Sequence, residues 1–192
     1  MSRRRNTTYT SMVVGFVTLV VALGQHYGWF DSAVQQAQVS QPGLYHVTEF
    51  VDGDTIKVNM NGSVETLRFI GVDTPETHDP RKAVQCFGLA AASFTKQLIG
   101  NNSVRLMADP TNTNRDRYNR LLRYIYLPNG TLINAEIIKQ GYGFAYTAFP
   151  FEKIDEFKAL EKQAREHSLG LWGNCQPFIN QYGGEQSNDA SP

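Results

Sequence analysis

The sequence lacks an excess of charge of either sign, because its 192 residues carry 18 basic and 18 acidic side chains. Setting aside Arg3, Arg4 and Arg5 leaves fifteen basic side chains against eighteen acidic ones, so the remainder is mildly acidic. Bulk charge therefore indicates no polyanionic partner, and any site for one has to be a local cluster. An apolar fraction of 41% is ordinary for a globular protein and allows a hydrophobic core.

Cysteine is scarce as well, with only Cys86 and Cys175 in the chain. No histidine or cysteine stands in a spacing typical of zinc ligands, which argues against a zinc site. In an exported protein an even number of cysteines favours a disulfide. Two free, buried thiols are the alternative.

Long apolar runs are absent except for residues 12–24, which follow the basic start MSRRR. This run is short for a full membrane span, although Trp29 and its aromatic neighbours suit a membrane interface. Residues 1–30 are therefore expected to form an apolar helix that acts as an uncleaved signal anchor or as a cleaved signal peptide. Either would place the rest of the chain outside the cytoplasm, secreted or anchored in the membrane.

Composition then divides the remaining chain into three parts. Residues 31–43 are polar and rich in glutamine, as in a linker. Residues 180–192 have the composition of a disordered tail. Residues 44–179 are left as a single domain, in which we find no internal repeat.

Hydrophobic periodicity predicts five strands and three helices in this domain. The strands are expected at residues 44–51, 55–60, 64–72, 103–108 and 120–127, and the helices at 83–100, 134–141 and 151–170. Asn61 and Gly62 are a strong two-residue hairpin signal, Asn134 a plausible N-cap, and Gly141 a plausible C-cap. Five strands with a helix between the third and fourth predict an α+β fold, a five-stranded OB-fold β-barrel. Because that fold serves many functions, the function has to be argued from the site.

The stretch FVDGDTIKV carries Asp52 and Asp54 on either side of a glycine at the start of a predicted strand. Taken alone, the pair could be a turn signal with solvated side chains. Two other polar clusters, RFIGVDTPET and RDRYNR, also fall at strand ends or in loops. Because the second and third strands form a tight hairpin, Asp54 is expected to lie close to Asp73.

Two carboxylates and a backbone carbonyl suit a hard cation such as Ca²⁺ or Mg²⁺. Arginines beside such a cation are best explained by an anion that meets both, and a phosphodiester fits. Glu76 could then orient or deprotonate an attacking water.

The motifs VDGDT, LRFIGVDTPET and DRYNRLLRYIY, with INAEIIKQGYGFAY and LGLW, together resemble the staphylococcal nuclease (thermonuclease) family. The resemblance runs from about residue 50 to residue 172. It implies a Ca²⁺-dependent endonuclease, a phosphodiesterase that cuts DNA and RNA and leaves 3′-phosphates. It also implies a five-stranded OB-fold barrel with three helices, and we expect a monomer.

The resemblance further implies roles for individual residues. The implied catalytic residues are Arg68, Glu76 and Arg120. The implied metal ligands are Asp54 and Asp73 through their side chains and Thr74 through its carbonyl, and Asp52 would support the metal site from behind. The implied substrate contacts are Arg117, Tyr118 and Tyr146. Exported relatives often carry a cysteine pair like Cys86 and Cys175.

Three positions depart from the family pattern. Ala148 stands where a second tyrosine is familiar, Asn119 where a glycine is usual, and Arg117 where a lysine is usual. The first departure puts base stacking in doubt. Two rival functions are a non-catalytic OB-fold module that binds nucleic acid at the membrane, and a membrane-tethered adaptor for proteins.

Overall fold

The computed structural model of the chain describes residues 14, 18, 43–77, 83–181 and 183–190. The chain divides into two compact units, residues 1–39 and 40–192. In the first unit only Val14 and Thr18 are described, both helical, so the signal segment and nearly all of the linker lie outside the described residues. Within the described residues no helix is long and apolar enough to cross a bilayer.

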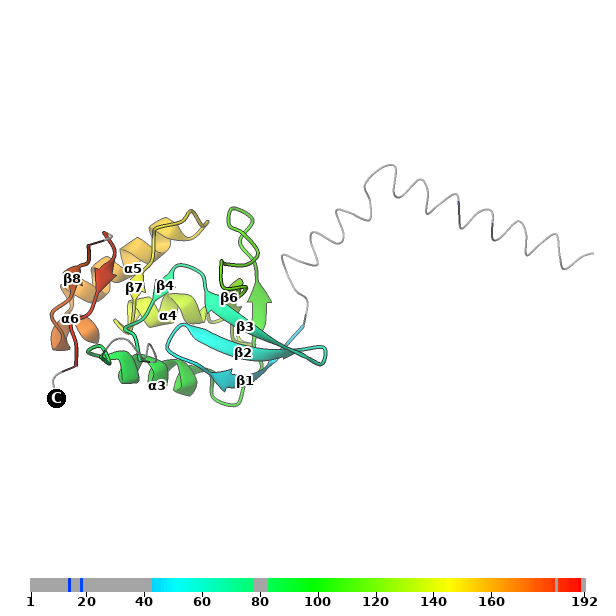
Figure 1. The fold of residues 1–192 in the computed structure, drawn as a ribbon, viewed down its shortest axis with the longest axis horizontal. Helices are drawn as coiled ribbons and strands as arrows, with labels where there is room; N and C mark the ends of the chain where they lie inside the picture. Colours follow the sequence, from blue (N-terminus) through cyan, green and yellow to red (C-terminus); the bar gives the residue numbers. More distant parts are fainter. Residues whose placement is uncertain (1–13, 15–17, 19–42, 78–82, 182, 191–192) are drawn as a thin grey trace, which may run out of the picture. The chain divides into compact units, whose positions relative to one another are not determined.

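The second unit is built on a five-stranded mixed sheet with the order β1-β2-β3-β6-β5 (Figure 1). Its strands are β1 (His46–Phe50), β2 (Thr55–Met60), β3 (Ser63–Phe69), β5 (Arg105–Met107) and β6 (Leu121–Tyr126). β3 and β6 pair in parallel, whereas the other neighbours are antiparallel. Tyr45 and Val104 exchange backbone hydrogen bonds of 2.8 and 2.9 Å beside the two edge strands. The sheet thus curls back toward itself, as the predicted α+β OB-fold requires.

The β2–β3 hairpin turns at Asn61 and Gly62, whose φ angles of 55° and 93° are those of the predicted two-residue turn. The third strand is shorter than predicted, because it is interrupted near Gly71 and the chain continues as a separate strand, β4 (Val72–Asp73). Gly71 has a φ of 71°, and a Cβ there would lie within 2.8 Å of two phenylalanine rings. β4 pairs with β7 (Phe144–Ala145) in a separate two-stranded sheet.

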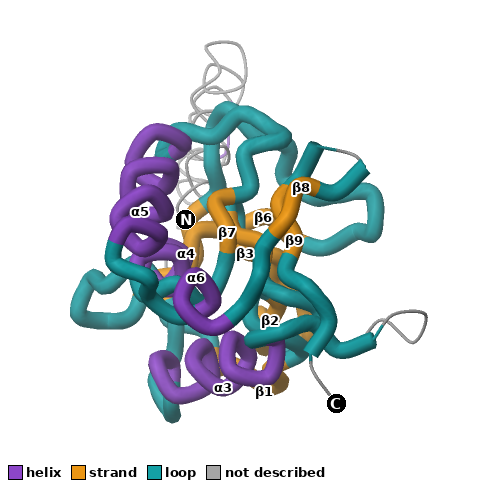
Figure 2. The backbone as a smooth tube through the Cα atoms, turned by 90° about the vertical axis from the view of Figure 1, so that its left-hand side faces the viewer, coloured by secondary structure: helices purple, strands orange, loops and turns teal. Residues whose placement is uncertain are grey.

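The described part of this unit has helices α3 (Gly88–Ile99), α4 (Ile133–Lys139), α5 (Ile154–Glu166) and the short α6 (Leu171–Asn174). α3 begins five residues later than predicted, because residues 84–86 pair with a distant segment instead of forming helical hydrogen bonds. In Figure 2, α3 and α5 lie on different sides of the strands. α4 packs against α3, α5 and β6, and so lies in the middle of the core.

The prediction that Asn134 is an N-cap is wrong, because α4 begins at Ile133 and its N-cap is Leu132. The Asn134 side chain is fully buried, accepts a hydrogen bond from Ile125 N–H and donates one to Ile70 O. It therefore ties α4 to the barrel instead of capping it. At the other end Gln140 is the C-cap, one residue before the predicted position.

Apolar residues of the sheet meet apolar faces of α4 and α5 in one core. Its fully buried members include Ile56, Val58, Leu67, Leu106, Ile125, Ile133, Ile137, Ile138 and Phe157. This core fixes the ends of β2 and β3, where the polar clusters lie.

The C-terminal segment differs from the predicted disordered tail, since β8 (Phe178–Ile179) and β9 (Glu185–Gln186) form a hairpin. Beyond it, Cys86 N–H donates to Asn188 O over 2.7 Å, and Ala190 N–H donates to Val84 O over 2.8 Å. Polar, glycine-containing sequences resemble disordered tails, but backbone pairing with an extended segment needs no apolar pattern.

Candidate active site

A cavity of about 250 Å³ opens at the end of the barrel where β2 begins and β3 and β4 end. Nine residues line it: Asp52, Asp54, Arg68, Asp73, Thr74, Pro75, Glu76, Tyr118 and Arg120. The three clusters picked out in the sequence thus meet in one place, and all six implied catalytic and metal-binding residues line the same cavity. Arg117 and Tyr146 are not among its lining residues.

Asp54 lies at the inner end of the cavity and is 4% exposed. One of its oxygens, Oδ1, accepts a hydrogen bond from the Thr55 hydroxyl, over 3.0 Å. The other, Oδ2, accepts from Thr74 N–H over 2.8 Å and from the Thr74 hydroxyl over 3.1 Å. This carboxylate therefore joins the start of β2 to the segment that follows β4.

Arg68 lies between the two predicted carboxylate ligands. Its guanidinium forms ion pairs with Asp54 Oδ1 and with Asp73 Oδ1, the latter over 2.7 Å. Asp54 and Asp73 therefore do share one end of the hairpin, as expected from its geometry. In this arrangement the arginine neutralises part of the charge that a cation would otherwise meet.

The cavity has more negative than positive charge, because four carboxylates face two guanidiniums. Burial raises the pKa of Asp52 and of Asp73, although attraction to Arg68 opposes the shift in both. Repulsion from Glu76 raises both pKa values further. An additional positive charge in the cavity would relieve this repulsion.

The glycine between the two aspartates allows a close approach. A Cβ at Gly53 would lie 2.8 Å from the Thr74 side chain, so a larger residue would push apart the two sides of the cavity. Asp52 Oδ1 accepts from Asp54 N–H over 3.0 Å, and Gly53 O accepts from the Thr95 hydroxyl over 2.6 Å. Thr95 lies on α3 and is fully buried. Sequence reasoning missed it, since a threonine inside a helix carries no signal for such a contact.

Glu76 is held through its backbone by Gln85, which sequence reasoning also missed. Glu76 N–H donates to Gln85 Oε1 over 2.7 Å, and Gln85 N–H donates to Glu76 O over 2.9 Å. The Glu76 carboxylate also accepts from Thr77 N–H, over 2.8 Å. Gln85 was placed in the predicted helix, and nothing in the local sequence distinguishes it there.

Arg120 is oriented by Asp116, a residue that the sequence placed in a basic cluster without a role. Asp116 Oδ2 accepts from Arg120 Nε over 2.7 Å, and Oδ1 accepts from Arg120 N–H and Tyr118 N–H, each over 2.9 Å. Partial burial alone would raise the pKa of Asp116, but these bonds outweigh it and lower the pKa. Asn119 has a φ of 65°, which asparagine tolerates better than most residues.

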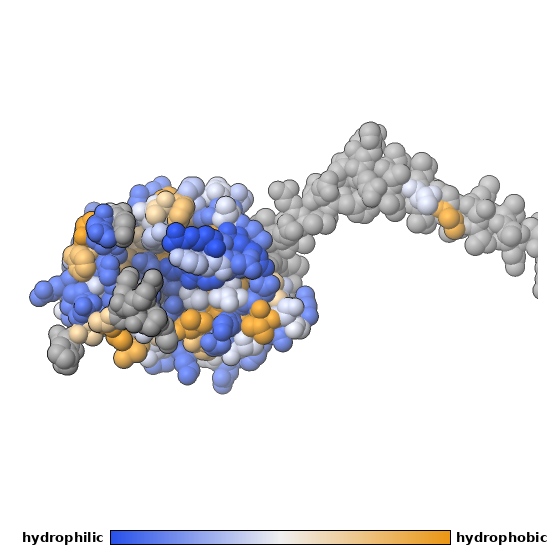
Figure 3. All heavy atoms as spheres, in the orientation of Figure 1, coloured by the Kyte–Doolittle hydropathy of each residue, from blue (hydrophilic) through white to orange (hydrophobic). Residues whose placement is uncertain are grey.

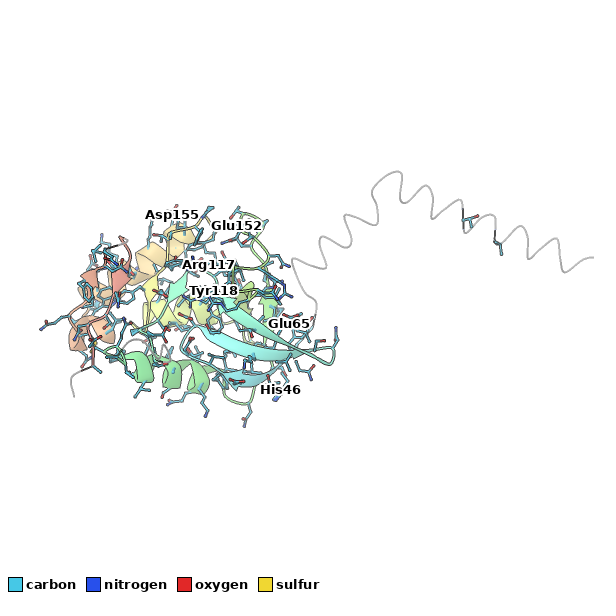
Figure 4. The ribbon with its side chains drawn as sticks, in the orientation of Figure 1. His46, Glu65, Arg117, Tyr118, Glu152 and Asp155 are labelled. Atoms are coloured by element: carbon cyan, nitrogen blue, oxygen red, sulfur yellow. A yellow bond between two sulfur atoms is a disulfide. The ribbon has the colours of Figure 1, made fainter. Side chains whose placement is uncertain are left out.

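Tyr118 and Arg117 lie at the rim of the cavity. The Arg120 Cζ atom is 5.4 Å and the Arg117 Cζ atom 4.8 Å from the Tyr118 ring centroid. Tyr118 is 65% exposed, and Figure 4 shows it next to Arg117 above the β2–β3 hairpin. Figure 3 shows hydrophilic residues gathered across the middle of the same face. An exposed aromatic ring close to two guanidiniums is suited to an anionic ligand with flat groups.

Tyr146 follows β7, outside the cavity lining, and is 39% exposed. Its N–H donates to Gly71 O over 3.0 Å, and its ring centroid is 6.1 Å from that of Phe149. The two rings form an exposed aromatic pair, in which Phe149 follows directly after Ala148.

No group of three or more His, Cys, Asp or Glu side chains within the described residues is arranged to hold a metal ion. The donor atoms of the cavity nevertheless suit a hard cation, because they are oxygens only and carry an excess of negative charge. Displacement of Arg68 from between Asp54 and Asp73 would make room for it.

Cys86 and Cys175 form a disulfide with a Cα–Cα distance of 5.9 Å. It ties the segment before α3 to the residue after α6, and the two cysteines are separated by 89 positions in the sequence.

Comparison with known proteins adds independent findings. The family model described as staphylococcal nuclease homologue matches residues 66–174. The chain is 35% identical over 164 residues to the thermonuclease of Staphylococcus hyicus. The aligned region covers 85% of this chain and 94% of that protein.

Two relatives come from Bacillus subtilis strain 168. Over 124 residues the chain is 40% identical to the SPbeta prophage-derived endonuclease YokF, covering 64% of this chain and 41% of that protein. Over 137 residues it is 38% identical to endonuclease YncB, covering 69% of this chain and 64% of that protein. The chain therefore spans less than two thirds of the length of these two relatives.

Proposed function

Since the chain belongs to the staphylococcal nuclease family, we propose that it is a nuclease whose active centre is the 250 Å³ cavity. The observation that carries the proposal is the meeting of Arg68 and Arg120 with four carboxylates in that one cavity. Relatives that are named endonuclease and thermonuclease support the same reaction class.

The substrate is a phosphodiester of DNA or RNA, and the products end in 3′-phosphates. Arg68 and Arg120 bind the phosphate oxygens and stabilise the negative charge that builds up on them during hydrolysis. Asp116 keeps Arg120 pointed into the cavity through its bond to Nε. Arg117, Tyr118 and Tyr146 contact neighbouring parts of the nucleic acid.

Glu76 orients the attacking water and accepts its proton. Glu76 lines the same cavity as both arginines, so its carboxylate can act on a water held against the bound phosphate. Asp52 supports the site from behind through its bond to Asp54 N–H.

The cofactor is Ca²⁺, held by the carboxylates of Asp54 and Asp73 and by the Thr74 carbonyl. When bound, it supplies positive charge to the phosphate oxygens and to the attacking water. The donors support this assignment, because three oxygens leave an irregular shell that Ca²⁺ tolerates better than Mg²⁺ does.

The protein acts as a monomer outside the cytoplasm, secreted or held at the membrane by residues 1–30. The basic start followed by an apolar run supports this placement.

An assay of single-stranded DNA cleavage tests the proposal. Chelator should abolish cleavage, Ca²⁺ should restore it, and Mg²⁺ should restore much less. Arg120→Ala should lower kcat by about 10²–10³-fold, since one stabiliser of the transition-state charge is lost. Arg105→Ala is the matched control, because Arg105 is an exposed arginine on β5 outside the cavity lining.

Cleavage that continues at full rate without any divalent ion would overturn the cofactor assignment. DNA binding without any cleavage would favour the non-catalytic binding module instead. A protein that neither binds nor cleaves DNA would favour the membrane-tethered adaptor for proteins.

A further inference from the structure

The position of the Glu76 backbone depends on Gln85, a residue that does not line the cavity. Gln85 is 5% exposed, and it hydrogen-bonds the Glu76 peptide groups on both sides, at N–H and at C=O. A single side chain and its own backbone N–H therefore fix where the Glu76 backbone lies. Such paired contacts leave little freedom for Glu76 to shift.

The direction of the Glu76 carboxylate follows from that backbone. One carboxylate oxygen accepts from the N–H of the next residue, Thr77. Because donor and acceptor are adjacent in the chain, a shift of the Glu76 backbone would move its carboxylate as well. A shift of Gln85 would therefore move the Glu76 backbone and its carboxylate with it.

Gln85 is held in turn by the segment of residues 187–190. Residues on both sides of Gln85 pair with this segment, through Cys86 N–H to Asn188 O and Ala190 N–H to Val84 O. Gln85 itself forms an antiparallel bridge with Asp189. On the other side Gln85 O accepts from Gly88 N–H, at the start of α3, over 3.0 Å.

The C-terminal segment is itself anchored. Asn188 Oδ1 accepts from Gln176 N–H over 2.7 Å, directly after the cysteine that is bonded to Cys86. Ser187 is 1% exposed. All these residues except Cys86 lie beyond residue 174, where the family match ends. The contact with Gln85 is therefore made by a part of the chain that the family match does not include.

We propose that Gln85 is a positioning residue for Glu76, and that residues 187–190 hold Gln85 in place. The inference rests on the proposed function, in which Glu76 accepts the proton of the attacking water. Small displacements of a reacting group cost up to about 100-fold in rate for 1 Å.

The test compares three variants of the full chain. Gln85→Met removes the acceptor and keeps an unbranched side chain, whereas Gln85→Glu keeps an acceptor oxygen at the same place. Gln97→Met is the control, because Gln97 is exposed on α3. We expect Gln85→Met to lower kcat by about 10- to 100-fold with KM unchanged. Gln85→Glu should recover most of the loss, and the control should match wild type.

A second readout does not depend on activity. Hydrogen exchange at the Glu76 amide should become at least about 10-fold faster in Gln85→Met, because that amide loses its acceptor. If Gln85→Met does not fold, Asn188→Ala carries the test, with a smaller kcat loss expected at unchanged KM.

An active wild type together with unchanged kcat in Gln85→Met, or in Asn188→Ala where that replaces it, overturns the positioning role alone. An unchanged exchange rate at Glu76 also overturns it. A wild-type protein that cleaves no nucleic acid overturns the proposed function, and the catalytic role of Gln85 with it.

Discussion

Two aspartates of this protein are equally buried but lie in very different surroundings. Asp54, in the cavity, and Asp109, beside β6, are each 4% exposed. Asp109 accepts hydrogen bonds from Thr111 N–H and hydroxyl, from the Tyr124 hydroxyl and from Glu152 N–H, over 2.5 to 2.8 Å. Burial alone would raise the pKa of Asp109, but these bonds outweigh it and lower the pKa.

Asp54, in contrast, shares the guanidinium of Arg68 with Asp73, in a cavity with more carboxylates than cations. Neutral donors satisfy Asp109 within the fold, so it has no need of a ligand. The carboxylates of Asp52, Asp73 and Glu76 in the same cavity repel one another, and an additional cation would balance them. Burial alone therefore does not distinguish Asp54, the proposed metal ligand, from Asp109; the number and charge of their partners do.

The largest expected effect is a loss of activity when a residue of the cavity, and not of the Asp109 region, is changed. Arg68→Ala should lower kcat by about 10²–10³-fold and leave the protein folded, because the charge stabiliser is lost while the core remains. Steady-state cleavage of single-stranded DNA measures it, with circular dichroism as the check on folding. Activity near that of wild type would remove Arg68 from the active centre.

The next effect is on stability. Asp109→Ala should lower the free energy of unfolding by about 3 kcal/mol, because it leaves the Tyr124 hydroxyl and the Glu152 N–H without their acceptor. The kcat of the folded protein should not change. Urea denaturation measures the loss, and Glu166→Ala is the control, since its ion pair with Lys162 is exposed. A loss below 1 kcal/mol would contradict the structural role of Asp109.

Calcium should stabilise the protein through the cavity alone. At a concentration 100 times its Kd it should raise the free energy of unfolding by about 2.7 kcal/mol. Asp54→Asn should abolish this gain, whereas Asp109→Asn should keep it. Thermal unfolding with and without Ca²⁺ distinguishes the two variants, and an equal response in both would place the cation elsewhere.

The smallest effect depends on pH. Because the pKa of Asp109 is lower in the folded state, its carboxylate stabilises the fold above its unfolded pKa of about 3.9. That stability is lost as the pH falls through the folded pKa. The difference in unfolding free energy between wild type and Asp109→Asn should therefore shrink below about pH 4. A difference that stays constant down to pH 2 would show that Asp109 acts by packing alone.

Much of the candidate site could be predicted, because its residues follow short local signals. Asn61 and Gly62 adopt positive φ readily, so they fix the register of β2 and β3 and bring Asp54 to Asp73. The split between β3 and β4 was missed, because it depends on rings that pack against Gly71 from far along the chain.

Local sequence patterns were enough to predict the order of strands and helices along the chain and the residue types that meet in the cavity, because both depend on neighbours within a few residues. That Asn134 faces inward instead of capping its helix depends on the packed fold, which places Ile125 N–H and Ile70 O within its reach. The packed fold also decided that Gln85 leaves the predicted helix to hold Glu76, and that residues 187–190 pair beside it. A buried polar group takes whichever partner the packed chain brings within reach, and those partners are far away in the sequence.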